Sequence, residues 1–268
     1  MLRFTAALLG ISVAAAVVPV AKAADLPPAP IIAPPVEDMS GWYLRGHIGI
    51  SSQRVRKLDN ALFDDTVIVS EKDFDESVFF GGGVGYQLNR WVRFDVTAEY
   101  RHDSDFDGFD SYSGFGGGTN DYRAKKKEYL FLANAYVDIG TWYGITPYVG
   151  AGIGATRLSI GDLTDVNEVT GGGGYAGTEH EWNLAWALYA GFGYQLTQNW
   201  TLDLGYRYLN LGDGRTGDII NFDGTNAVYN PLEFKDVSSH DFMIGLRYRF
   251  GGSPAPMFGD EEPLFAKF

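Results

Sequence analysis

Apolar residues alternate with small or polar residues in eight short stretches of this chain. In the clearest stretch, every second residue from Trp182 to Tyr194 is apolar, and the residues between them are small or polar. A period of two indicates a β-strand whose two faces differ. The eight predicted strands span residues 41–51, 78–87, 92–101, 128–139, 147–158, 182–194, 200–210 and 239–250.

The two faces of these predicted strands do not have the character expected in a soluble protein. In residues 92–101, Phe94 and Val96 lie on one face, whereas Asp95 and Glu99 lie on the other. A soluble sandwich would enclose the large apolar side chains and leave the charges in water. Aromatic residues near the ends of the apolar faces instead favour a barrel whose outer surface meets lipid. About ten residues is also the length of a tilted membrane strand.

The gaps between the predicted strands alternate in length. Short gaps fall at 88–90, 140–146 and 196–199, and long gaps fall at 52–77, 102–127, 159–180 and 211–238. Membrane barrels have short periplasmic turns and long extracellular loops. The pattern therefore predicts an all-β fold, a transmembrane antiparallel up-and-down β-barrel of about eight strands. Whether the first hairpin continues above the membrane is left open, although the apolar segment 67–69 favours it.

The two ends of the chain differ from the predicted barrel, which occupies residues 41–250. A basic start, an apolar run and Ala21-Lys22-Ala23 predict a secretory signal peptide over residues 1–23. Residues 24–40 are rich in proline and predict an extended periplasmic leader. Three prolines in residues 251–268 exclude a central strand, so this segment is predicted to be a periplasmic tail.

Composition excludes several classes of function. The 268 residues carry a formal net charge of −13, and no basic stripe offsets it, which argues against nucleic-acid binding. The chain has no cysteine, so it forms neither disulfides nor a thiolate metal site. Aromatic residues make up 15% of the chain, which suits the two interfaces of a membrane barrel.

Several segments together resemble a known family. They are the opening Trp42-Tyr43-Leu44-Arg45-Gly46, the Gly-Tyr-Gln-Leu turns at 85–88 and 193–196, and the ending Ile244-Gly245-Leu246-Arg247-Tyr248-Arg249-Phe250. With the leader, they resemble the opacity/OmpA-like outer-membrane β-barrels, and most of all the small major outer-membrane (porin-family) proteins of alphaproteobacteria. The resemblance covers residues 24–250.

This resemblance implies a location in the outer membrane and a structural role that supports envelope integrity, with surface-exposed loops. Outer-membrane lipids, lipopolysaccharide and the barrel-assembly machinery are the implied partners. The family also contains adhesive and haemin-binding members, so a surface protein that binds haemin or a host-surface ligand is an alternative. No enzymatic activity and no cofactor are expected.

The charged residues on the inward faces are the candidate functional residues. They are Arg45, Arg93, Asp95, Glu99, Asp138, Asp203, Arg207, Asp241 and Arg247, together with Arg101 and Arg249. The lumen of an eight-stranded barrel is only wide enough for side chains to fill. Enclosed charges must therefore pair or be hydrated. We predict a polar network inside the barrel, with a narrow ion channel as the alternative and a wide pore excluded by size.

Four features of the predicted loops carry weaker hypotheses. His102 and His180 could meet above the barrel and contact haem. His102-Asp103-Ser104 is similar to the His-x-Ser element of outer-membrane lipid A deacylases, whereas a solvated loop is the ordinary interpretation. The alternating carboxylates of residues 103–110 could hold calcium. Residues 125–127, three lysines above the fourth predicted strand, could contact lipid phosphates.

Overall fold

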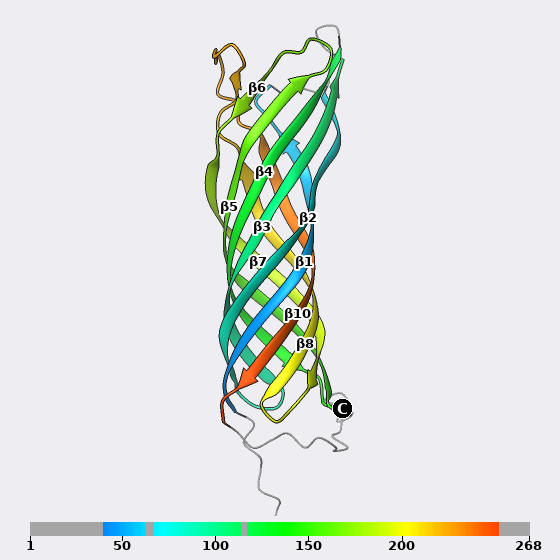
Figure 1. The fold of residues 1–268 in the computed structure, drawn as a ribbon, viewed down its shortest axis with the longest axis vertical. Coiled ribbons are helices and arrows are strands. Elements are labelled where there is room, and N and C mark those ends of the chain that lie inside the picture. Colours follow the sequence, from blue (N-terminus) through cyan, green and yellow to red (C-terminus); the bar gives the residue numbers. More distant parts are fainter. Residues whose placement is uncertain (1–39, 63–66, 114–116, 252–268) are drawn as a thin grey trace, which may run out of the picture. The chain divides into compact units, whose positions relative to one another are not determined.

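Eight long antiparallel strands form a closed barrel in the computed structural model, which describes residues 40–62, 67–113 and 117–251 (Figure 1). The barrel strands are β1 (Gly41–Asp59), β2 (Val67–Gln87), β3 (Val92–Tyr112), β4 (Gly118–Asp138), β5 (Ile145–Asn167), β7 (Glu179–Gln195), β8 (Trp200–Arg215) and β10 (Glu233–Arg249). Each pairs with its neighbours along the chain, and β1 pairs with β10 to close the ring. The predicted eight-stranded up-and-down barrel is confirmed.

Two short strands and the chain ends complete the description. β6 (Gly173–Ala176) pairs with β5 and with β9 (Ile220–Asn221) at the end of the barrel opposite the short turns. The predicted signal peptide, all but Ser40 of the predicted leader and all but Gly251 of the predicted tail lie outside the described residues. No helix in the described part of the chain is long and apolar enough to cross a membrane.

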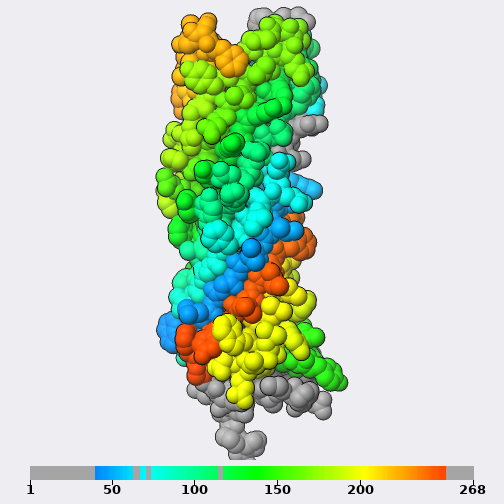
Figure 2. Space-filling model, viewed as in Figure 1, coloured from blue at the N-terminus to red at the C-terminus, as the bar shows by residue number. Residues whose placement is uncertain are grey.

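A band of exposed apolar side chains surrounds the barrel between its short turns and its middle. On β1, for example, Trp42, Ile48 and Ile50 are 59%, 50% and 51% exposed. Aromatic pairs border the band at both ends, with Trp200 beside Tyr248 near the short turns and Tyr100 beside Tyr129 on the far side. Figure 2 shows the side chains of β1 (blue) and β10 (orange-red) running diagonally across the wall. This apolar exterior is the surface that a membrane barrel presents to acyl chains.

The strands are longer than predicted, and the positions of the predicted strand ends above the band are wrong. The barrel strands have 16 to 23 residues, so they occupy much of the segments 52–77 and 102–127 that were expected to be loops. The first hairpin does continue above the band, as the segment 67–69 favoured. The alternation persists there with reversed polarity: Phe106 points inward, whereas Asp105 and Asp107 point outward. Water surrounds this part of the barrel, so its apolar side chains face inward.

The inward apolar side chains above the band form the upper part of the buried core, which we call the upper apolar cluster. It contains Val55, Leu58, Phe74, Phe106, Tyr122, Ala124, Ile160, Leu163, Leu211, Ile219, Leu232, Phe234 and Val237. The rings of Phe74 and Phe106 have centroids 5.2 Å apart, and those of Phe106 and Phe234 are 4.8 Å apart. Full burial of each such side chain contributes about 1.5–3 kcal/mol. The upper barrel is therefore a packed stem rather than a set of loops.

Candidate functional site: the lumen of the barrel

The lumen nearest the short turns contains three ion pairs. Arg45 on β1 donates to Asp95 on β3 over 3.0 Å, and to the hydroxyl of Tyr136 over 2.8 Å. Arg93 Nε lies 3.0 Å from Asp138, and its guanidinium lies over the rings of Tyr136 and Tyr148. The third pair joins Arg247 to Asp203 over 3.3 Å near the mouth. The close approach of these groups follows from the register, which points alternate residues of β1, β3, β4, β8 and β10 inward.

The middle of the lumen is filled by a cluster centred on Arg207, a fully buried residue of β8. Its guanidinium donates to both oxygens of Glu99 over 2.6 and 2.7 Å, and to Asp241 over 2.7 Å. Arg101 on β3 also donates to Asp241, at 2.6 Å, and His47 Nε2 lies 2.9 Å from Glu99. Bidentate contacts between guanidinium and carboxylate groups are among the strongest hydrogen bonds in proteins.

The cluster continues upward through Lys126 and Glu128, two residues that were not predicted to lie in the lumen. Lys126 points inward, where its Nζ lies 2.8 Å from Glu128 and also contacts Gln53. Glu128 in turn lies 3.3 Å from Arg101. The prediction that Lys126 contacts lipid phosphates together with its two neighbours was wrong. On β4 every second residue faces outward, so Lys125 and Lys127 are exposed and Lys126 is buried. Strand parity would have separated them if β4 had been expected to begin earlier.

The central cluster, which comprises His47, Glu99, Arg101, Lys126, Glu128, Arg207 and Asp241, is balanced in charge apart from His47. Three cationic side chains face three carboxylates, and all of them are buried. The rings of Phe79 and Phe74 cover the cations from the side, with Arg101 4.7 Å from the Phe79 centroid and Lys126 4.8 Å from the Phe74 centroid. The lumen is thus occupied by paired side chains from its middle up to the upper apolar cluster.

A smaller polar group lies above the apolar band, inside the tips of β3, β4 and β5. Asp110 accepts hydrogen bonds from Tyr122 over 2.7 Å and from Asn120 over 3.0 Å. Burial, with the nearby charge of Asp110, raises the pKa of Asp165 to about 7. Burial and the charge of Asp165 likewise raise the pKa of Tyr122. The carboxyl group of Asp165 therefore retains its proton well above the pH at which an aspartate usually loses it.

The structure does not assemble the sites hypothesised for the predicted loops. His102 and His180 lie on β3 and β7 with β4 and β5 between them, and both side chains point outward from the curved wall, so they diverge instead of facing each other across one iron. His102 faces outward, whereas Ser104 is buried inside, so they form no catalytic pair. In the ranges 40–62, 67–113 and 117–251, no group of three or more His, Cys, Asp or Glu residues could hold a metal ion.

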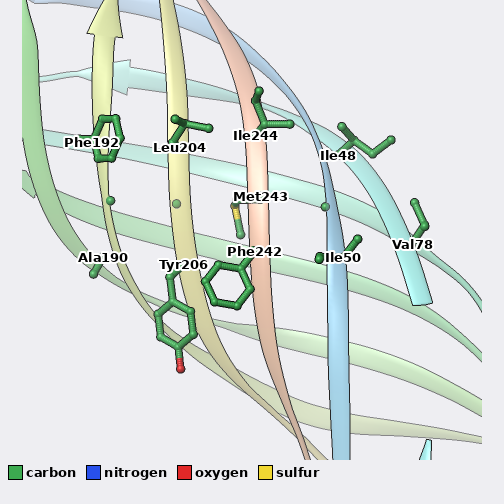
Figure 3. A pocket seen from close by; sticks show the side chains of 13 residues that line it. Ile48, Ile50, Val78, Ala190, Phe192, Leu204, Tyr206, Phe242, Met243 and Ile244 are labelled. Carbon is green, nitrogen blue, oxygen red and sulfur yellow. The ribbon is translucent and has the colours of Figure 1, made fainter. Parts of the chain in front are cut away.

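A shallow apolar groove crosses the outer surface of β7, β8, β10 and β1. Its two rims are cross-strand rows of outward-pointing apolar side chains, Phe192, Leu204, Ile244 and Ile48 in one row and Ala190, Tyr206, Phe242 and Ile50 in the next (Figure 3). Its floor is formed by Gly49, Gly191, Gly205 and Met243. A Cβ on Gly49 would collide with the Phe79 ring inside the barrel. The groove lies within the apolar band, where acyl chains would fill it.

Comparison with known proteins connects this fold to the bacterial outer membrane. The model of a family described as outer membrane protein beta-barrel domain matches residues 5–250. An uncharacterized protein of Brucella melitensis is 34% identical over 86% of this chain and 93% of its own length. Outer membrane protein PagN of Salmonella typhimurium is 24% identical over 78% and 90%, respectively. The crystal structure of Neisserial surface protein A matches 79% of this chain and 99% of its own, with 19% identity and a TM-score of 0.43.

The central cluster predicts that removing an arginine from the middle of the lumen lowers stability much more than removing one near the mouth. Arg207→Met leaves Glu99 and Asp241 short of a cation in a closed lumen, so it should lower the free energy of unfolding by about 3–5 kcal/mol. Arg247→Met breaks a single pair near the mouth and should cost less than half as much. Denaturant unfolding of both variants in the same detergent measures the difference. Equal costs would contradict a tightly coupled central cluster.

The raised pKa of Asp165 predicts that this residue makes the protein less stable as the pH rises. Because the folded state keeps this proton up to about pH 7, whereas an ordinary aspartate loses it near 3.8, Asp165 lowers stability as pH rises through that window. Asp165→Asn should therefore stabilise the protein more at pH 8 than at pH 5. Unfolding midpoints at both values test this, with the exposed Asp107→Asn as control. A pH-independent difference would show that Asp165 ionises normally.

Proposed function

The chain belongs to the outer membrane protein beta-barrel domain family, and on this premise we propose that it is a closed structural barrel that supports envelope integrity. The proposal extends the family assignment, which establishes an outer-membrane barrel, and it includes no enzymatic activity. It includes export through the predicted signal peptide and insertion by the barrel-assembly machinery. The resemblance to opacity/OmpA-like and porin-family proteins agrees with it.

The filled lumen is the observation that carries this proposal. Arg207 and Asp241 are fully buried in the middle of the barrel, and Phe106 and Phe234 are fully buried above them. A channel needs a hydrated path between the two ends, and these side chains occupy that path. The geometry therefore favours a barrier element over a narrow ion channel.

Contacts across the lumen also favour a mechanical role. Arg207 joins β8 to Glu99 on β3, and Arg101 joins β3 to Asp241 on β10, although neither pair of strands is adjacent in the sheet. Such links resist flattening or shearing of the barrel, because any deformation separates buried charges. Above the band, the upper apolar cluster continues the packing, so the stem stands rigidly on the outer surface.

Surface recognition is a second candidate, favoured by exposed aromatic residues at the end of the stem. Tyr175 on β6 is 47% exposed, and Phe222 and Tyr229 in the connection from β8 to β10 are 52% and 64% exposed. Aromatic side chains of this kind are common anchors at protein interfaces. A haemin site receives no comparable support, because the outward side chains of His102 and His180 diverge on strands that are separated by β4 and β5.

A deletion strain of the native host separates the two candidates. Loss of the protein should increase uptake of a hydrophobic fluorescent dye, because the outer membrane loses a barrier element. Both the wild-type chain and the variant Tyr175→Ser/Phe222→Ser/Tyr229→Ser should restore the barrier, whereas only the wild type would retain adhesion to host cells if the stem recognises them. Unchanged dye uptake in the deletion strain would overturn the structural role.

A further inference from the structure

A cation lies between two exposed aromatic residues on the outer wall of the barrel. Arg157 on β5 has Tyr129 of β4 and Trp182 of β7 as its cross-strand partners. These aromatic side chains are 43% and 61% exposed, and Arg157 is half-buried between them. Within the described part of the chain, no ion pair or hydrogen bond to the Arg157 guanidinium is found. An arginine held at a membrane interface without a protein partner is available to an external anion.

The next row of side chains places further polar groups beside Arg157. Lys127 on β4 lies opposite Ser159 on β5, which lies opposite His180 on β7. Ser159 Oγ and His180 Nδ1 are 2.8 Å apart. On one sheet face, diagonal neighbours are about 7–8 Å apart, within reach of long side chains, so Lys127, Arg157 and His180 surround one spot above Ser159.

Two acidic residues near this spot are paired with Lys127 and with Arg215, which leaves the charge of Arg157 uncompensated. Lys127 lies 3.4 Å from Asp103 on the side of β3, away from β5. Glu181 on β7 lies 3.0 Å from Arg215 on β8. The surface between β4 and β7 therefore keeps the positive charge of Arg157 in a protein whose formal net charge is −13.

The height of the spot on the barrel matches the position of lipid phosphates. Tyr100 and Tyr129 have ring centroids 5.2 Å apart, and Phe131 stacks on Trp182 at 6.2 Å, so aromatic residues mark the interface on the stem side. Below this row, the outward faces of β5 and β7 are apolar and include Ile153 and Leu184. A cationic spot directly above an apolar strip is complementary to a lipid with a phosphate head group and several acyl chains.

We propose that Arg157, Lys127 and His180 bind a phosphate group of lipopolysaccharide in the outer leaflet. The stem and the long hairpins rise from this side of the band, so the spot faces the leaflet that carries lipopolysaccharide. Arg157 and Lys127 supply charge-assisted hydrogen bonds to the phosphate, and the Ser159–His180 pair supplies a further donor. The acyl chains lie against Phe131, Ile153 and Leu184. This inference rests on the outer-membrane location within the proposed function and assigns a specific lipid site to it.

Binding of purified lipid A to the full chain in detergent micelles, measured by native mass spectrometry, tests the site. Bisphosphorylated lipid A should bind the wild type, and Arg157→Gln/Lys127→Gln should weaken that binding about 10-fold or more. Arg157→Lys should keep most of the affinity, and Arg54→Gln, which removes an exposed outward cation on β1, should leave it unchanged. Heat-modifiable gel migration checks that each variant is folded.

Three outcomes would overturn the site. They are equal binding by the wild type and the double variant, equal binding of dephosphorylated lipid A, and equal binding of phosphatidylglycerol, which would indicate a general anionic-lipid surface. Failure here with an intact barrier phenotype overturns only this site. Loss of the barrier phenotype with intact lipid A binding overturns only the structural role.

Discussion

Charges enclosed in a narrow lumen must be paired, and the rest of this barrel is arranged around that requirement. Arg207 on β8 contacts Asp241 on the adjacent strand β10 and Glu99 on β3, which lies on the opposite side of the ring. A strand that slipped by one residue would carry its charges to the apolar exterior and leave their partners unpaired inside. The central cluster therefore does more than fill space. It specifies the register in which β3, β8 and β10 close the barrel, and that register places the aromatic rows and Arg157 on the outer wall.

The same strands meet two different surroundings along their length. Within the apolar band the bulky hydrocarbon side chains face outward and the charges face inward, whereas above it Phe106 faces inward and Asp105 and Asp107 face outward. The two arrangements meet at the level of Lys126 and Glu128, whose ion pair caps the polar lumen below the upper apolar cluster. Because the ladders run through this boundary, the stem is continuous with the membrane barrel.

The sequence predicted the membrane part of this fold well, because alternation there has a single interpretation. Residues such as Arg93, Asp95 and Glu99 could be placed inside by parity alone. The stem was not predicted, because its alternation has the reversed polarity and the pattern of apolar outward faces ends at Arg101. The ion pairs could not be predicted, since the partner of Arg207 depends on how far the strands are staggered around the ring, which is a property of the closed barrel.

Side chains fill the lumen of this barrel, and their charges are paired with one another. Conductance of the purified full chain in planar lipid bilayers measures whether ions can pass these side chains. A membrane without discrete conductance steps in concentrated potassium chloride is expected. A stable, ohmic open state of the correctly folded protein would contradict it, because ions would then cross the level that Arg207, Glu99 and Asp241 occupy.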